Sequence, residues 1–325
     1  MRIAIAGAGA IGGYIGAKLA KAGADVVLFA RGPHLRAMQE RGLRVIGDED
    51  DFEVKPQATG ELADLAGADV VVLGVKAHGL TSLAPQLRPI LGPETVVVST
   101  QNGIPWWYFQ NHPGELNGLH LERVDPGGVI ASAIEPERVI GSLAYFSTDI
   151  AEPGVIHHTE GNRLSLGEPG GARTERVKSL AETLIAAGLR APVTTRFRHE
   201  IWVKLLGNVA FNPISALTGG TLEELVRHAE TAAVIRQIMA ETEAVAAKLG
   251  IELPISIDQR MAGAEKVGAH KTSMLQDLEA GRPLELEPIV GATVELGERL
   301  GVAMPATRAV YACVKLLDER RRSGH

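Results

Sequence analysis

The sequence predicts an α/β protein in which a doubly wound, mostly parallel sheet is followed by an all-α C-terminal domain. In the first half of the chain, short apolar runs alternate with segments of helical spacing, which is the pattern of βαβ units. The run 68–75 is continuously apolar, as expected for a strand buried on both faces of a parallel sheet. From about residue 200, long helical patterns replace the strands.

A glycine-rich turn lies in the first βαβ unit. An apolar run over 3–6 leads into Gly7-Ala8-Gly9-Ala10-Ile11-Gly12, a helical segment follows, and a second apolar run covers 26–29. A GxGxxG pattern between a strand and a helix is the dinucleotide-binding fingerprint of a Rossmann-type domain. Gly7 permits the tight turn, Gly9 lets a pyrophosphate approach, Gly12 lets helix and strand pack, and Ala10 and Ile11 begin the helix that faces the phosphates. The alternative is an ordinary glycine-rich turn.

The end of the second strand indicates which nicotinamide cofactor binds. An NAD site usually places Asp or Glu there to accept a hydrogen bond from the ribose 2′-hydroxyl. This chain has Ala30 followed by Arg31, whose guanidinium can pair with a 2′-phosphate. The residues therefore favour NADPH over NADH, unless Arg31 is simply an exposed loop residue.

The remaining elements follow in order along the chain. In the first half we expect helices over 34–41, 80–91 and 174–187, and strands over 68–75, 95–100, 133–145, 154–159 and 163–166. In the second half we expect helices over 201–211, 221–228, 232–249, 257–267, 288–300 and 305–322. These elements predict a Rossmann-like NADP-binding domain over 1–193 and a helical substrate and catalytic domain over 194–325.

Composition excludes several classes of protein. The net charge of −6 gives no reason to expect nucleic acid as a partner. No stretch approaches the roughly 20 apolar residues that span a bilayer, so no membrane association is expected. A single cysteine, Cys313, excludes intrachain disulfides and suits a reducing compartment, which predicts a cytoplasmic location.

Two polar residues follow buried strands of the predicted sheet. Asn102 comes after the strand at 95–100, within Gln101-Asn102-Gly103, and Lys76 comes after the strand at 68–75. Ligands bind at the carboxyl ends of strands in open α/β sheets, so Asn102 can bond substrate or nicotinamide and Lys76 can steady the cofactor. The alternatives are a turn residue for Asn102 and a solvated loop residue for Lys76.

The segment 200–216 is apolar on nearly every face if it is helical, which predicts burial. Lys204 and Asn208 share one face, and Asn212 continues the row, although Pro213 disfavours helical geometry at Asn212. A buried lysine needs a cleft or a carboxylate partner, and beside a carbonyl group it can act as a general acid. The alternative is a lysine whose charged end reaches solvent.

A second polar cluster covers 270–287, where Ser273, Asp277, Glu285 and Glu287 surround a Gly-Arg-Pro break. Glu285 or Glu287 can supply the carboxylate for Lys204, and the spacing does not say which; exposed charges beside a turn are the alternative. The sequence has no GxSxG, HExxH or paired CxxC motif, and His157-His158 is expected to lie in a strand, so no metal site is predicted.

Together these residues resemble the ketopantoate reductase (2-dehydropantoate 2-reductase) family over essentially the whole chain. The similar parts are GAGAIGG at the N-terminus, Arg31, Lys76, QNG at 101–103, KLLGNVAFNPISAL from Lys204 and SMLQDLEAGRPLELE from Ser273. The resemblance implies NADPH-dependent reduction of a 2-keto acid, most directly 2-dehydropantoate, to the 2-hydroxy acid in pantothenate biosynthesis.

The resemblance also implies roles for individual residues. Lys204 would be the general acid, and Glu285 the acidic residue that binds a substrate hydroxyl. Ser273 would bind substrate, and three asparagines would surround the nicotinamide and substrate: Asn102, Asn208 and Asn212. A preorganised cation such as Lys204 on a buried helix suits the alkoxide that develops during reduction.

Two features depart from the family pattern. His270 stands where an asparagine that contacts substrate is expected, and the segment 104–129, with its aromatic run Trp106-Trp107-Tyr108-Phe109, is longer than in the best-known members. The aromatic run can reshape the acyl pocket or form a subunit contact, and by analogy the chain can form a homodimer. These departures keep open a related dehydrogenase of another small 2-keto or hydroxy carboxylate. A third alternative is a non-catalytic NADP(H)-binding regulator, which needs the glycine turn but neither Lys204 nor Glu285.

Overall fold

The computed structural model describes residues 1–48 and 50–323. The chain divides into two compact units. The first comprises Met1–Gln101, Trp106–His120 and Gly127–Phe197, and the second comprises Asn102–Pro105, Leu121–Pro126 and Arg198–His325. The chain therefore contributes two short internal segments to the second unit, and the domain boundary at 193/194 stays a prediction.

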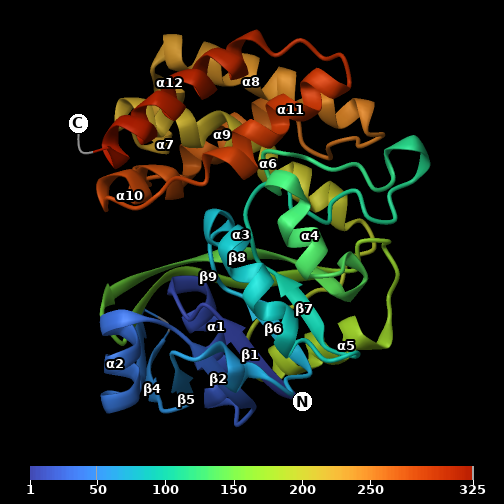
Figure 1. The fold of residues 1–325 in the computed structure, drawn as a ribbon. Coiled ribbons are helices and arrows are strands. Elements are labelled where there is room, and N and C mark those ends of the chain that lie inside the picture. Colours follow the sequence, from blue (N-terminus) through green and yellow to red (C-terminus); the bar gives the residue numbers. More distant parts are fainter. Residues whose placement is uncertain (49, 324–325) are drawn as a thin grey trace. The chain divides into compact units, whose positions relative to one another are not determined.

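The first unit is built on a mixed sheet of nine strands, counted over the described residues, in the order β4-β3-β9-β8-β7-β6-β1-β2-β5 (Figure 1). The strands are β1 Arg2–Ala6, β2 Asp25–Phe29, β3 Leu43–Gly47, β4 Asp51–Val54, β5 Gln57–Thr59, β6 Val70–Leu73, β7 Val96–Ser99, β8 Val139–Glu152 and β9 Val155–Gly167. Only β8–β9 and β3–β4 pair antiparallel among these strands. The predicted doubly wound, mostly parallel sheet is confirmed.

Five helices belong to this unit in the described part of the chain: α1 Ala10–Lys21, α2 Gly32–Arg41, α3 Ala77–Leu87, α4 Val129–Ala133 and α5 Glu175–Ala186. Apolar side chains of α1 and α5, such as Ile15 and Leu180, share one core with Ile3 and Ile5 of β1. The alternate residues of β1, including Ala4, are also buried, so both faces of the central sheet are covered. Short 3-10 turns cover Leu62–Leu65, Arg88–Ile90, Gly114–Leu116, Pro126–Gly128 and Pro136–Arg138.

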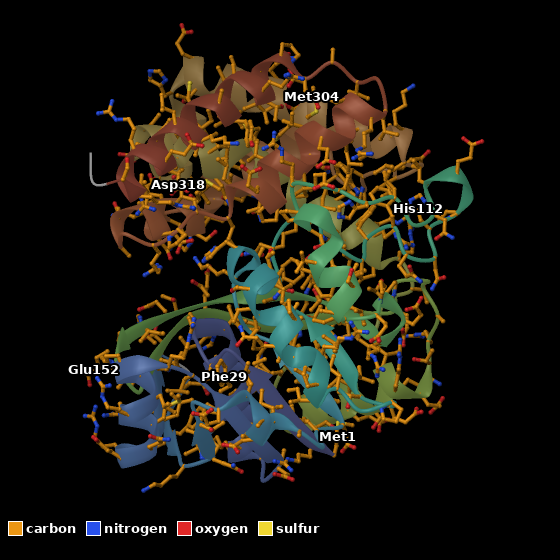
Figure 2. All side chains as sticks on the ribbon, viewed as in Figure 1. Met1, Phe29, His112, Glu152, Met304 and Asp318 are labelled. Carbon is orange, nitrogen blue, oxygen red and sulfur yellow. The ribbon has the colours of Figure 1, made fainter. Side chains whose placement is uncertain are left out.

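The second unit is helical. Its elements are α6 Phe197–Thr218, which begins at the last residue of the first unit, α7 Leu222–Arg227, α8 Ala229–Lys248, α9 Ile257–Val267, α10 Ser273–Glu279, a π-helical turn Glu287–Gly291, α11 Ala292–Arg299 and α12 Pro305–Arg322. Helices α8 and α12 lie side by side, because the buried Glu241 carboxylate accepts hydrogen bonds from the first turn of α12 at Thr307, 2.9 Å from N and 2.6 Å from Oγ1 (Figure 1). Met304 precedes α12 and Asp318 lies on it (Figure 2).

Two strand predictions need correction. The strand expected over 133–145 begins only at Val139, because 129–133 form α4 and Pro136, which has no N–H, opens a 3-10 turn. The two strands expected over 154–159 and 163–166 are one strand, β9. The residues between them form an irregularity at Gly161, which has φ +74°, where the register against β8 shifts.

The expected end of the helix at residue 211 is also wrong. Helix α6 continues through Asn212 and Pro213 to Thr218. Proline in a helix costs about 3 kcal/mol. The side chains around it, including Phe211 and Ile214, are buried, and that packing offsets the cost.

Several short elements were not anticipated, namely β3, β4, β5, α4 and α10, and their apolar patterns are too brief to indicate a period. His157 and His158 do lie in strand β9, as predicted. In the described part of the chain, no helix is both long and apolar enough to cross a membrane.

Candidate active site

The glycine-rich turn joins β1 to α1, and its geometry explains two of its three glycines. Gly7 has φ +107°, and a Cβ there would lie 2.5 Å from Val75 Cγ1. A Cβ on Gly12 would collide with the carbonyl oxygen of Gly7. The N–H of Ala8 donates to the carbonyl of Phe29 at 2.7 Å, which ties the turn to β2. The first and third glycines are therefore required by the protein's own packing.

Gly9 is different, because a Cβ at this position would meet no atom within 4 Å. Gly9 is the N-cap residue of α1, and the N–H groups of the first turn, at Ala10 and Ile11, have no partner within the helix. A helix N-terminus with open space before it favours an anion. This is the arrangement that a dinucleotide pyrophosphate requires, so the turn fits a nicotinamide cofactor.

Two cations lie at the same edge of the sheet as this turn. Arg31 is exposed, two residues beyond Phe29 at the end of β2, and occupies the N-cap position of α2. Lys76 is partly exposed, follows β6 and occupies the N-cap position of α3. Because β1, β2 and β6 are parallel neighbours, their carboxyl ends share this edge. The structure therefore gathers the glycine turn, Arg31 and Lys76 there.

The segment Gln101-Asn102-Gly103 crosses from one unit to the other: Gln101 belongs to the first unit, and Asn102 and Gly103 belong to the second. The Gln101 side chain donates to the carbonyls of Leu73 and Val75, both at 3.0 Å. Gly103, in the second unit, has φ +86°, and a Cβ there would collide with the carbonyl of Pro288. The N–H of Ile104 donates to that same carbonyl at 2.8 Å. Gly103 thus lets the backbone approach the π-helical turn closely, which brings Asn102 to Glu285.

Lys204, Asn102 and Glu285 form a hydrogen-bonded row within the second unit. The Lys204 Nζ donates to Asn102 Oδ1 at 2.7 Å. Asn102 Nδ2 donates to Glu285 Oε2 at 3.2 Å. Helix α6 carries the lysine, the 102–105 segment carries the asparagine, and the residue just before the helical start at Leu286 carries the carboxylate. One amide group therefore bridges the cation and the anion.

Burial sets the protonation behaviour of this lysine. The Lys204 residue is partly exposed, but protein atoms surround its ammonium group closely. Desolvation lowers the pKa of Lys204 to about 8, and the charge of Glu285 opposes part of that decrease. A lysine with a pKa near neutrality can both hold and release a proton at working pH, which general acid catalysis requires.

The structure also decides between the two glutamates that the sequence left open. Glu285, which is buried, bonds Asn102, whereas Glu287 accepts a hydrogen bond from Tyr311 on α12 at 2.9 Å. Glu285 and Glu287 therefore face different partners. The carboxylate that balances Lys204 is Glu285.

The other predicted polar residues differ in how deeply they are buried. Asn208 lies one turn after Lys204 on α6 and is partly buried. Asn212 is only 4% exposed, and its Nδ2 has no hydrogen-bond partner among the described residues. Ser273 is exposed at the first position of α10, after the N-cap residue Thr272. The structure thus joins Lys204, Asn102 and Glu285 by hydrogen bonds, and it does not join Ser273 to them.

Sequence reasoning missed two supporting glycines. A Cβ on Gly74, at the end of β6, would collide with the carbonyl of Gly7, so Gly74 is needed for the cofactor turn. On α6, the Arg260 guanidinium from α9 lies against Gly207, where a side chain would otherwise be. Gly74 follows a buried strand, and Gly207 is a glycine inside a helix; both are signals that sequence reading can use.

Three of the four rings of the aromatic run 106–109 are buried within the first unit. Trp107 lies in the first unit, where its ring centroid is 5.9 Å from that of Phe197, and Tyr108 packs edge-on against Phe109 at 4.8 Å. Trp107, Tyr108 and Phe109 are each no more than 2% exposed. These three rings fill a core, because their large apolar surface is best removed from water, and they are not available for a subunit contact. The described residues also contain no cluster of three or more His, Cys, Asp or Glu side chains that can hold a metal ion.

Comparison with known proteins identifies the family of this chain. Residues 3–171 match the family model described as ketopantoate reductase PanE/ApbA, and residues 196–318 match the model described as ketopantoate reductase PanE/ApbA C terminal. The chain belongs to the ketopantoate reductase family. The resemblance seen in the sequence is therefore confirmed.

Relatives are similar over their full length. The 2-dehydropantoate 2-reductase of Mesorhizobium japonicum is 51% identical over 322 residues, covering 99% of both chains. The crystal structure of a candidate ketopantoate reductase from Ralstonia solanacearum has a TM-score of 0.93 at 40% identity, covering 98% of each chain. The 2-dehydropantoate 2-reductase of Methylococcus capsulatus has a TM-score of 0.84 at 33% identity, covering 99% of this chain and 98% of that one.

Members of the family are oxidoreductases that use NADPH, and this chain is an oxidoreductase of that kind. Its residues fit the cofactor. The open space at Gly9 suits the pyrophosphate, and the exposed Arg31, with no carboxylate at the end of β2, suits a 2′-phosphate. The preference for NADPH over NADH read from Ala30-Arg31 agrees with the family.

Proposed function

We propose that this chain reduces 2-dehydropantoate (ketopantoate) to pantoate with NADPH, a step of pantothenate biosynthesis. The single observation that carries the proposal is the hydrogen-bonded row Lys204–Asn102–Glu285. A reductase of this substrate needs a proton donor for the keto oxygen and an acceptor for the substrate hydroxyl. The row offers an ammonium group and a carboxylate that contact the same amide.

Lys204 is the general acid in this proposal. NADPH, when bound, supplies a hydride to the keto carbon. As the carbonyl gains negative charge, the Lys204 ammonium stabilises the oxygen and gives it a proton, so the C–O double bond becomes a C–OH single bond. The lysine is then reprotonated from solvent, to which it has partial access. The overall change is keto acid plus NADPH plus a proton to hydroxy acid plus NADP⁺.

Glu285 accepts a hydrogen bond from the substrate hydroxyl and so orients the keto group. Asn102, Asn208, Asn212 and Ser273 supply further polar contacts to substrate. The buried Nδ2 of Asn212, which has no partner within the described residues, supports this role, because a buried donor without a partner is costly.

The cofactor is held by the glycine turn and the two cations at the sheet edge. Gly7, Gly9, Ala10, Ile11 and Gly12 form the pyrophosphate site. Arg31 pairs with the 2′-phosphate, Lys76 steadies the phosphates, and Asn102 contacts the nicotinamide. The open space at Gly9 supports the pyrophosphate assignment.

A steady-state assay tests the proposal. Purified protein should oxidise NADPH with 2-dehydropantoate at a higher kcat/KM than with other small 2-keto acids. If the protein prefers another 2-keto or hydroxy carboxylate, the proposed substrate is wrong and the proposed reaction class is kept. NADPH binding without turnover of any keto acid would make the chain a regulator and refute the proposal.

Lys204→Ala tests the catalytic role directly. Loss of the general acid should lower kcat by about 10²–10⁴-fold while NADPH still binds. Lys248→Ala, an exposed lysine on α8, is the matched control and should leave kcat unchanged. An unchanged rate in Lys204→Ala would remove the lysine from the mechanism.

The assembly and location are part of the same proposal. We infer a homodimer by analogy with helical second domains, and a cytoplasmic location from the single cysteine Cys313 and the biosynthetic role. The division into a cofactor domain over 1–193 and a substrate domain over 194–325 belongs here as well. Light scattering of the purified chain tests the dimer.

A further inference from the structure

Glu287, the glutamate that does not face Lys204, is the centre of a second charged cluster. Tyr311 from α12 donates its hydroxyl to both carboxylate oxygens of Glu287, at 2.9 and 3.0 Å. Arg123 and Lys315 approach the same carboxylate, at 3.4 and 3.6 Å. The Arg123 guanidinium also lies over the Tyr311 ring, 5.5 Å from its centroid. Three side chains from two other segments thus hold one carboxylate.

Arg123 is itself held firmly, because its segment, Leu121–Pro126, is bonded to α11. The backbone N–H groups of Glu122 and Arg123 both donate to the Glu295 carboxylate, at 3.1 and 2.9 Å. Desolvation acts to raise the pKa of Glu295, but these hydrogen bonds and Arg299 outweigh it, so the pKa is lowered and the carboxylate stays ionised. This segment belongs to the long 104–129 stretch that departs from the family pattern.

Glu287 is close enough to Glu285 to govern its position. Glu285 immediately precedes the helical start at Leu286, and Glu287 begins the π-helical turn. Leu284 and Leu286, on either side of Glu285, are both buried. Glu287 lies two residues after Glu285, and consecutive Cα atoms lie about 3.8 Å apart, so a shift of the backbone at Glu287 is passed on to Glu285. The bonds to Glu287 therefore act on the turn that carries the proposed substrate carboxylate.

The contacts of Glu287 are unequal in strength. The side chains of the two ion pairs are well exposed, at 42% for Arg123, 38% for Lys315 and 38% for Glu287. Because solvent screens exposed charges, each ion pair alone holds the Glu287 carboxylate only weakly. The Tyr311 residue is 9% exposed, and burial together with the Glu287 carboxylate raises the pKa of Tyr311, which keeps its hydroxyl protonated as a donor. Tyr311 is therefore the main anchor, and Arg123 is the second.

We propose that Tyr311 and Arg123 are positioning residues that fix Glu285 through Glu287 and so give the enzyme its preference for keto acids that carry a hydroxyl group. The inference rests on the proposed function, in which Glu285 accepts the substrate hydroxyl. Tyr311 and Arg123 touch neither substrate nor cofactor in this scheme. Their effect is confined to the hydroxyl that Glu285 recognises.

The test compares two substrates that differ only in that hydroxyl: 2-dehydropantoate and 3,3-dimethyl-2-oxobutanoate. Tyr311→Phe removes the hydroxyl that both oxygens of Glu287 share and keeps the ring. We expect kcat/KM for 2-dehydropantoate to fall about three- to tenfold, which corresponds to the loss of one shared hydrogen-bond donor, and kcat/KM for the deoxy analogue to stay unchanged. Arg123→Ala should act in the same direction by a smaller factor.

Matched controls separate positioning from general damage. Arg308→Ala, which breaks another exposed pair on α12, with Glu298, should affect neither substrate. In a Glu285→Ala background, Tyr311→Phe should have no further effect, because the group that it positions is gone. If Tyr311→Phe fails to fold, as judged by thermal denaturation, the surface variant Arg123→Ala carries the test with both substrates.

Two results would overturn the inference: equal losses with both substrates, which indicate a general structural role, or no loss with either. Failure of the proposed function looks different. In that case the wild-type protein itself would not turn over 2-dehydropantoate, or would not prefer it to the deoxy analogue.

Discussion

The Nζ of Lys204 and the Oδ1 of Asn102 lie 2.7 Å apart, and the same amide donates to Glu285 from its nitrogen at 3.2 Å. One amide thus contacts both the cation and the anion. Desolvation lowers the pKa of Lys204 more than the Glu285 charge raises it, so the lysine can release its proton near pH 8. The following predictions depend on this relationship and on the glycine turn.

The rate of reduction should fall as pH rises above about 8, because Lys204 has a pKa of about 8 and must be protonated to act as an acid. Below that pH the ammonium form dominates and kcat/KM should be independent of this group. A pH–rate profile of NADPH oxidation measures this decrease, which is the alkaline limb of the profile. In Lys204→Arg, whose guanidinium stays protonated, any residual activity should lack the limb; an alkaline limb that persists there would assign the titration to another group.

Asn102→Asp should move that limb to higher pH. The substitution keeps an acceptor oxygen for Lys204 and adds a negative charge beside it, and an opposite charge at this distance raises the pKa of a lysine by about one to three pH units. Asn102→Ala removes the acceptor without adding a charge and should leave the limb near its original position. Identical profiles for wild type and Asn102→Asp would show that a charge at position 102 does not act on Lys204.

Gly9→Ala and Gly12→Ala should have opposite consequences. A Cβ on Gly9 meets open space, so the variant should fold with an unchanged Tm but bind NADPH at least about tenfold more weakly, because the methyl group enters the pyrophosphate site. A Cβ on Gly12 collides with the Gly7 carbonyl, which should cost about 1–3 kcal/mol of unfolding free energy. Thermal denaturation without cofactor and NADPH fluorescence titration separate the two. Equal Tm losses would refute the distinction.

Arg31→Ala should weaken NADPH binding about tenfold and leave NADH binding unchanged, because only NADPH carries the 2′-phosphate that this exposed guanidinium can bond. Titrations with both cofactors measure the difference. Arg36→Ala, an exposed arginine on α2, is the control for general loss of positive charge. Equal weakening toward both cofactors would show that Arg31 acts on the fold and not on the phosphate.

Many helices and strands could be predicted from the sequence because the residues that determine them are close neighbours in the chain. A strand, a glycine turn and a helix follow one another within the first 29 residues, and the structure has β1, α1 and β2 in those places. Helices 257–267 and 305–322 were predicted with the limits that α9 and α12 have, because their caps are encoded nearby: Ser256 forms a capping box, and Pro305 begins α12. Helix α6 was predicted too short, because burial and not local preference carries it through Pro213.

By itself, the sequence determined the cofactor turn, the position of Arg31 after the second strand and the presence of Lys204 on a buried helix, since each depends on neighbours within a few residues. Only the tertiary structure decided which glutamate balances the lysine, and it placed Asn102 in contact with both of them. Residues 102, 204 and 285 lie far apart in the chain and meet through hydrogen bonds. Their contact depends on Gly103, which has no side chain to collide with the carbonyl of Pro288. Spacing along a sequence does not encode such contacts, because they depend on how separate elements pack.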